Sequence, residues 1–188
     1  MRLDEFVNNK ILNELDMPRT RGLAGNILKS NGYEKIGRGA YASVWAKPGE
    51  NTIVKIFDND DSSYKKFINL TLSNPNDHFP KIKGKMFQIN DRYTAIRIER
   101  LEPVDKAKYI QLGLAPVYNY LNYVKNSRSH MSPEGTETML AKIDELDKNQ
   151  PGIKKALDLI AKNFEYFDFN PDNVMLRGNT IVITDPVN

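Results

Sequence analysis

The residues best suited to do chemistry lie near the C-terminal end of the chain, within positions 166–185. Asp168 follows an apolar helical pattern, Asn173 stands five positions later, and Asp185 follows a second short apolar run. A nucleotide phosphotransferase needs a carboxylate that meets the attacking hydroxyl, and an Asn with a second carboxylate to hold Mg²⁺. Mg²⁺ is a hard cation that prefers such oxygen ligands. The competing interpretation is a hairpin with ordinary turn residues, because short motifs often match by chance.

A Gly-rich segment lies far upstream of these residues. Positions 33–45 predict a strand, a turn around Gly37 and Gly39, and a second strand. A Gly-x-Gly turn lets backbone N–H groups approach a phosphate with no side chain in the way. Because this turn joins two strands and does not open a helix, it is not the dinucleotide-binding fingerprint. The chain also lacks the Gly-Lys-Ser/Thr sequence typical of a P-loop.

Lys55 lies in a third predicted strand, 52–57, where it shares one face with the apolar Ile53 and Phe57. Burying a lysine costs free energy unless an anionic group pairs with it. Lysines on edge strands are more often solvated than functional, so Lys55 alone indicates little. A Gly-rich hairpin followed by a strand lysine is more specific than either feature by itself.

Apolar residues at helical or alternating spacing predict the elements that position these residues. The predicted helices span 3–15, 19–29, 62–72, 109–125, 136–147 and 153–164, and the further strands span 81–88, 92–100, 174–176 and 181–184. The strands 81–88 and 92–100 are expected to pair, and Asn31 and Gly32 to cap the second helix. The tyrosines of 109–125 could stack on bases, but interior packing is the favoured interpretation. His78 has no metal partner in the pattern and is expected at the surface.

Composition limits the class of protein. With 188 residues, the chain forms one large domain or two small lobes around a real core. The charged fraction of 27%, the hydrophobic fraction of 40% and the net charge of +3 fit a globular protein and do not by themselves indicate nucleic-acid binding. No apolar run approaches the roughly 18 residues of a membrane helix, and the N-terminus lacks a signal-peptide core. The absence of cysteine excludes disulfides and thiolate metal sites and fits a reducing cytoplasm.

Four segments in one order resemble the motifs of protein kinases. Residues 37–44 look like the Gly-rich loop, with Ala42 at its third glycine, and 53–55 look like the strand that carries the kinase lysine. Residues 168–173 resemble the catalytic loop, and 185–187 stand where kinases have Asp-Phe-Gly. In so small a protein, this combination is similar to the early host-takeover Ser/Thr protein kinases of podophages of the coliphage T-seven type.

The resemblance implies an α+β fold of two lobes, like that of protein kinases. Extra N-terminal helices would occupy 1–32. An N-lobe with an antiparallel sheet, the Gly-rich loop, the strand lysine and the hinge would occupy 33–101. A reduced helical C-lobe with the catalytic loop and the metal-binding Asp would occupy 102–188. The chain stops at Asn188 with no activation segment, so the expectation is either a truncated chain or a minimal family.

The resemblance also implies ATP and Mg²⁺ as cofactors. The implied catalytic residues are Asp168, which meets the acceptor hydroxyl, Lys55, which contacts the α- and β-phosphates, and Asn170, whose amide donates to the γ-phosphate. Asn173 and Asp185 would hold Mg²⁺. The implied nucleotide-binding residues are Gly37, Gly39, Tyr41, Val44, Lys55, Glu99, Leu101 and Met175. For the apolar members of this set, plain core packing is the alternative.

Three substitutions depart from the kinase pattern. The helix 62–72 has no acid to pair with Lys55, so the partner is either an acid of 58–61 or only ATP and Asp185. Tyr166 and Phe167 replace the His-Arg before the catalytic acid. Asn170 replaces a lysine found in many Ser/Thr kinases, and an uncharged donor there is expected to slow the reaction.

The function expected from these residues is an ATP- and Mg²⁺-dependent protein Ser/Thr kinase that acts on host proteins in the host cytoplasm. No membrane association and no direct nucleic-acid binding are expected. Two alternatives stay open: a pseudokinase-like module that binds and inhibits a host protein, and a small-molecule kinase.

Overall fold

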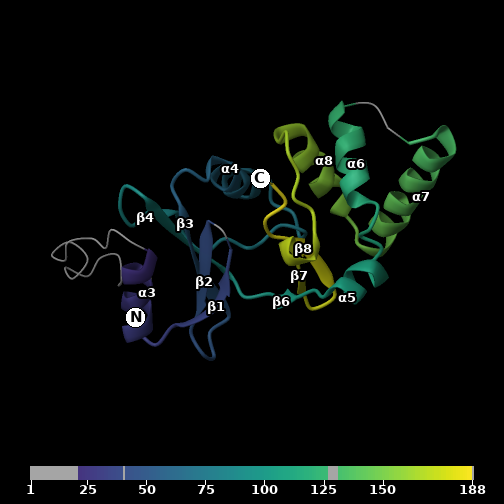
Figure 1. Cartoon of the computed structure of the whole chain (residues 1–188). Helices are drawn as coiled ribbons and strands as arrows, with labels where there is room; N and C mark the ends of the chain where they lie inside the picture. The colour runs from purple at the N-terminus through teal and green to yellow at the C-terminus, as the bar shows by residue number, and fades with distance from the viewer. Residues whose placement is uncertain (1–20, 40, 127–130, 188) are drawn as a thin grey trace. The chain divides into compact units, whose positions relative to one another are not determined.

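The computed structural model describes residues 21–39, 41–126 and 131–187, with side chains described from residue 25 onward. Two compact units make up the chain. The first comprises Met1–Ser62 and Lys81–Arg100, and the second comprises Ser63–Pro80 and Leu101–Asn188. Both units mix helices and strands, so the α+β class is confirmed (Figure 1). The helix predicted over 3–15 lies outside the described residues.

The first unit contains an antiparallel sheet of five strands in the order β1-β2-β3-β5-β4. Its strands are β1 (Glu34–Arg38), β2 (Ala42–Ala46), β3 (Thr52–Asp58), β4 (Phe87–Gln88) and β5 (Tyr93–Glu99). The strand predicted over 81–88 is therefore too long. Ile82 forms only an isolated bridge with Ile98, and Gly84 takes a positive φ of 89°, which interrupts the extended backbone before β4.

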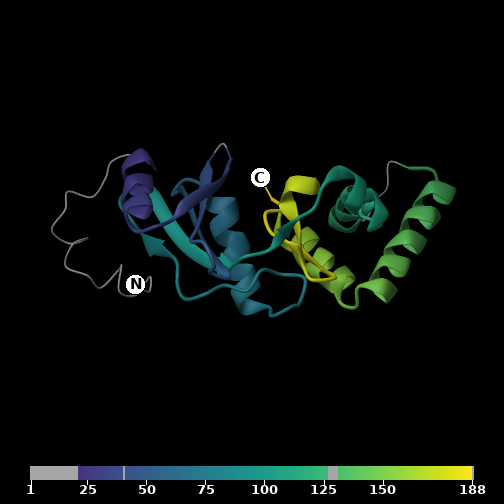
Figure 2. The same cartoon turned by 90° about the horizontal axis from the view of Figure 1, so that it is seen from below.

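The helix α3 (Arg21–Ser30) packs on one face of this sheet (Figure 2). Its Leu28 joins a buried cluster with Trp45 and Val54. A Cβ on Gly25 would lie 2.6 Å from Cζ2 of Trp45, so the close approach of helix and indole depends on glycine. The helix ends at Ser30, and Gly32 follows it with a φ of 81°, the left-handed conformation that the sequence predicts for this cap.

The second unit contains five helices, a three-stranded antiparallel sheet and one short 3₁₀ turn among its described residues. These are α4 (Ser62–Ser73), α5 (Lys106–Gln111), α6 (Val117–Asn126), α7 (Pro133–Asn149), α8 (Ile153–Asn163), η1 (Pro171–Asn173), β6 (Glu102–Pro103), β7 (Val174–Arg177) and β8 (Thr180–Ile183). The helices α6, α7 and α8 lie side by side (Figures 1 and 2). Ile153, Leu157 and Ile160 of α8 are fully buried, so this helix is the core of the unit.

The single helix predicted over 109–125 is wrong, because the chain forms α5 and α6 there. Gly113 has a positive φ of 74°, which ends α5, and Pro116 stands just before α6. The preference for packing is confirmed for two tyrosines. Tyr109 is buried, and burial raises the pKa of its phenol to about 12. Tyr120 is also buried and donates its hydroxyl to Oδ1 of Asp158 at 2.6 Å.

The helix α4 is packed by aromatic contacts within the second unit. The rings of Phe67 and Phe79 meet edge to face, with centroids 5.8 Å apart. Lys66 places its ammonium 5.0 Å from the ring centroid of Phe164 and donates to the carbonyl of Asn163. Residues 63–80 belong to the second unit, and the contacts of Lys66 with Phe164 and Asn163 join α4 to the rest of that unit.

His78 is buried with 2% exposure, so the surface expectation is wrong. Its Nδ1 lies 2.7 Å from the carbonyl oxygen of Ile181, and its Nε2 lies 3.1 Å from that of Pro151. Its own carbonyl accepts a bond of 2.9 Å from the N–H of Ile183. These partners are far away in sequence, so the polar neighbours of His78 gave no indication of its burial. The imidazole ties the turn after α4 to β8 and to the start of α8.

We predict that His78→Ala lowers the free energy of unfolding by about 1–3 kcal/mol, because it removes hydrogen-bond partners from buried carbonyls. His78→Gln keeps a donor and retains part of this stability. The exposed neighbour Asp77→Ala is the matched control and stays near wild type. Urea denaturation followed by circular dichroism measures all three, and wild-type stability in His78→Ala contradicts the prediction.

Candidate functional site

The loop that carries Asp168 is held by contacts on both sides. The helix α8 ends at Phe164, and Asp168 then donates its N–H to the carbonyl of Pro186 at 2.9 Å. Phe169 is buried with its ring centroid 6.2 Å from that of Tyr109. The loop is therefore fixed between the residues after β8 and the helix α5.

Two amide side chains hold the carboxylate of Asp168. Nδ2 of Asn170 donates to its Oδ1 at 2.7 Å, and Nδ2 of Asn173 donates to its Oδ2 at 3.0 Å. Asn173 also donates to the backbone carbonyl of Asp168 at 2.7 Å. Asp168 is itself exposed, so the carboxylate is oriented yet open to a ligand.

Asn170 has a second task, which sequence reasoning missed. Its Oδ1 accepts the N–H of Asp172 at 2.9 Å and so caps the turn η1. The signal was present in the sequence, because Asn followed by Pro is a frequent start for such a turn.

Hydrogen bonds of the residues on either side of Asp185 tie it to the loop that carries Asp168. Thr184 donates both its N–H, at 2.9 Å, and its hydroxyl, at 3.1 Å, to the carbonyl of Asn173. Pro186, on the other side of Asp185, accepts the N–H of Asp168. The second unit therefore brings together the three oxygen-bearing residues that the sequence singled out, Asp168, Asn173 and Asp185. The sequence did not reveal this positioning role of Thr184.

The donor set suits a hard cation. Nδ2 of Asn173 makes both bonds to Asp168, so Oδ1 is the amide atom that can bind a metal. Asp185 adds carboxylate oxygens. Among the described residues, no group of three or more His, Cys, Asp or Glu could hold a metal by itself. Mg²⁺ takes one or two protein carboxylates and completes its shell with water and substrate phosphates, so Asn173 and Asp185 could contribute to such a site.

In the first unit, three candidate residues, Gly37, Val44 and Lys55, form one cross-strand row with Ile96. Gly37 pairs with Val44, Val44 with Lys55, and Lys55 with Ile96. Directly paired residues share a face of the sheet, so Val44 and Lys55 are neighbours on it. Lys55 is buried, with 8% exposure. A Cβ on Gly37 would lie 3.4 Å from Cβ of Val44, so glycine keeps the space beside this row open.

The Gly-rich turn differs from the simple expectation at Gly39. Its N–H donates to the carbonyl of Ala42 at 2.9 Å and so closes the hairpin. The missing side chain of Gly39, rather than its amide, is the feature that would let a phosphate approach. Tyr41 is 61% exposed beside it, and Ala40 lies outside the described residues.

The remaining nucleotide-binding residues that the resemblance implies, Glu99, Leu101 and Met175, are divided between the two units. Glu99 ends β5 in the first unit, where its N–H donates to the carbonyl of Lys81 at 3.0 Å. Leu101 belongs to the second unit, as does Met175, which is half-buried in β7 opposite Val182.

The helix α4 supplies no acid to Lys55, as the sequence indicates. Among the acids of 58–61, Asp58 ends β3 and lies an odd number of positions from Lys55. Strand alternation therefore places Asp58 on the opposite face of the sheet.

No family model and no curated protein matches this chain. Among solved structures, the chain is similar to Rad53 1–466 in complex with AMP-PNP. The TM-score is 0.42 and the identity is 14%, over 88% of this chain and 42% of that one. This chain thus spans less than half the length of the Rad53 chain. No described helix is both long and apolar enough to cross a bilayer.

We predict that Asn170→Ala loosens the loop without unfolding the protein. Loss of the cap costs about 1 kcal/mol, so amide hydrogen exchange at Asp172 and Asn173 should quicken roughly fivefold. Asn149→Ala, at an exposed position ending α7, is the control and leaves these amides unchanged. Equal exchange in Asn170→Ala and wild type contradicts the assigned role.

Proposed function

We propose that this protein is an ATP- and Mg²⁺-dependent phosphotransferase, and specifically a phage-type protein Ser/Thr kinase that phosphorylates host proteins in the host cytoplasm. The observation that carries the proposal is the grouping of Asp168, Asn173 and Asp185 by the hydrogen bonds that join the Asp168 loop to the residues on either side of Asp185. An oriented carboxylate beside an oxygen-ligand pair is what phosphoryl transfer asks of a protein, since positioning and electrostatics supply nearly all of the catalysis.

Each side chain of the second unit has a distinct task under this proposal. Asp168 orients the acceptor hydroxyl and accepts its proton, with its carboxylate held by two amides. Asn173 and Asp185 hold Mg²⁺, which neutralises phosphate charge when it is bound. Asn170 uses one amide hydrogen on Asp168, and the other remains to donate to the γ-phosphate.

Most of the nucleotide contacts come from the first unit under the same proposal, and Leu101 and Met175 of the second unit add the others. Lys55 binds the α- and β-phosphates, and Gly37 and Gly39 leave room above them, with Tyr41 at the tip of the turn. Val44 packs on one face of the adenine, in the row that it shares with Lys55. Met175 packs on the other face, and the backbone of Glu99 and Leu101 meets the base edge.

One observation favours a second candidate. Because α4 carries no acid, the ion pair that orders the lysine of active kinases has no counterpart in this helix. A pseudokinase-like module that binds and inhibits a host protein would tolerate this loss.

The test is transfer of ³²P from ATP to proteins of a host-cell extract in the presence of Mg²⁺. Asp168→Asn removes the proton acceptor while keeping the shape, and we predict that transfer falls about 10²- to 10⁴-fold. Asp172→Asn is the matched control, because it removes an exposed carboxylate from the same turn, and it should stay within a few-fold of wild type.

Labelling that persists in Asp168→Asn at the wild-type rate overturns the assignment of Asp168. An intact biological effect of that variant, with no label transferred by either protein, supports the inhibitor module instead.

A further inference from the structure

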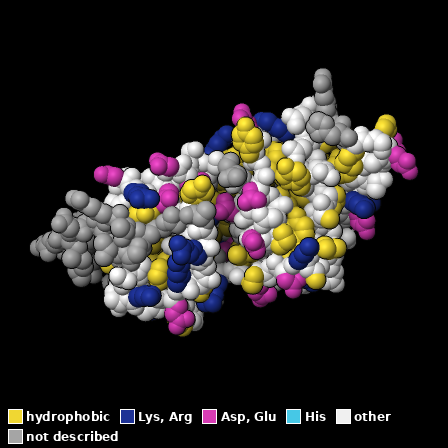
Figure 3. Space-filling model, in the orientation of Figure 1, with side chains coloured by type: hydrophobic (Ala, Val, Ile, Leu, Met, Phe, Trp, Pro, Cys, Tyr) yellow, Lys and Arg dark blue, Asp and Glu magenta, His cyan; other side chains and the backbone are white. Residues whose placement is uncertain are grey.

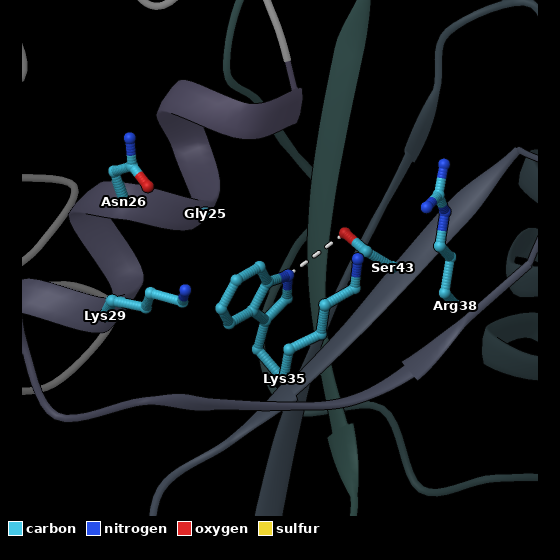
Figure 4. Close-up of a pocket in the computed structure, with 7 residues that line it drawn as sticks. Gly25, Asn26, Lys29, Lys35, Arg38 and Ser43 are labelled. Atoms are coloured by element: carbon cyan, nitrogen blue, oxygen red, sulfur yellow. Dashed lines mark hydrogen bonds between the residues drawn. The ribbon is translucent and has the colours of Figure 1, made fainter.

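A pocket lies within the first unit, between α3 and the sheet, with a volume of about 390 Å³ (Figure 4). Residues from α3, β1 and β2 line it, namely Gly25, Asn26, Lys29, Lys35, Arg38, Ser43 and Trp45. Its volume lies within the roughly 300–1,000 Å³ typical of ligand sites. It therefore has room for a charged group together with part of the molecule that carries it.

The strand register places this pocket on the sheet face opposite Lys55. Lys35 pairs with Trp45 and Arg38 pairs with Ser43, so these four side chains share a face. Trp45 directly follows Val44, which pairs with Lys55, and successive strand residues point to opposite faces. The pocket is therefore separate from the row proposed to contact the nucleotide.

The lining is positively charged. Lys29 comes from α3, and Lys35 and Arg38 come from β1; all three are exposed, and none of the seven described lining residues is acidic. Figure 3 shows Lys and Arg side chains gathered over this part of the sheet. Because ammonium and guanidinium groups are the usual protein partners of phosphate oxygens, the lining favours an anion.

A buried hydroxyl adds a directed donor to these charges. The indole N–H of Trp45 donates to Oγ of Ser43 at 3.0 Å, as the dashed line in Figure 4 shows. Ser43 is 4% exposed and lines the pocket. Because the bond from Trp45 uses an acceptor lone pair, the hydroxyl hydrogen of Ser43 remains to donate. The ammonium of Lys35 lies 5.9 Å from the Trp45 ring centroid, which holds that charge beside the pocket.

We propose that this pocket binds a phosphate monoester, with Lys29, Lys35 and Arg38 around the dianion and Ser43 donating to one of its oxygens. Asn26, on the rim, offers a further polar contact to the group that carries the phosphate. The same chemistry is present in a free small phosphate ester and in a phosphorylated serine of a protein. The proposal does not depend on the kinase assignment.

The chain contains one tryptophan, and because Trp45 lines this pocket its fluorescence can report on binding there. At constant ionic strength, the protein is titrated with inorganic phosphate, with a phosphoserine peptide and with the matching serine peptide. With inorganic phosphate we expect a saturable change in fluorescence, and with the serine peptide we expect no saturation. If the natural ligand is a phosphorylated protein side chain, the phosphoserine peptide binds more tightly than inorganic phosphate. Equal binding of phosphate and the phosphopeptide identifies a small phosphate as the source.

The double variant Lys35→Gln/Arg38→Gln should weaken binding at least tenfold, while the exposed Lys85→Gln in the same unit leaves it unchanged. Lys55→Gln, checked for folding by circular dichroism, should also keep the response. A signal that is linear in concentration, one that survives in the double variant, or one lost only in Lys55→Gln overturns the proposal.

Discussion

The candidate site depends on the hydrogen bonds of one residue, Asn173. Its side-chain amide donates to the backbone and to the carboxylate of Asp168, and its carbonyl accepts two bonds from Thr184. These bonds join the end of the loop to the end of the β7–β8 hairpin. Asp168 and Asp185 stand on either side of that hairpin in the sequence, and Asn173 brings them to one place. The two amides hold the exposed carboxylate of Asp168 in one orientation, as a general base needs, so these hydrogen bonds are the physical basis for the proposed phosphotransfer.

The sheet of the first unit presents two faces with different chemistry. One face carries the row of Gly37, Val44 and Lys55, in which the buried Lys55 lies beside Val44 and Gly37 leaves space next to them. The other carries Trp45 under α3 and the basic pocket beside it. The pairing register separates the two sets, because Gly37 pairs with Val44, whereas Lys35 pairs with Trp45 and Arg38 with Ser43. The register of β1 shifts between Lys35 and Gly37, so Lys35 and Arg38 share a face although they lie three positions apart. The nucleotide contacts and the anion pocket that we propose therefore lie on opposite faces of one small sheet.

Much of the fold and of the candidate site could be predicted from the sequence wherever the determinants are local. The Gly-rich hairpin, the strand of Lys55 and the helix α8 follow from turn residues and apolar spacing. The errors arose where distant contacts decide the outcome. The burial of His78 depends on carbonyls of Ile181 and Pro151 far away in sequence. The break between α5 and α6 was readable in principle, because Gly113 and Pro116 both stand there, but the apolar spacing runs through it.

Binding of Mg²⁺·ATP tests the central claim most directly, because it does not require a known protein substrate. A ligand at a hundred times its dissociation constant stabilises the native state by about 2.7 kcal/mol. We predict that ATP and Mg²⁺ together raise the melting temperature of the wild type, and that either alone raises it much less. In Asp185→Ala, we expect the additional increase from the combination to be lost. If ATP and Mg²⁺ leave the melting temperature of the wild type unchanged at millimolar concentrations, or if Asp185→Ala responds as the wild type does, the proposed phosphotransfer site is contradicted.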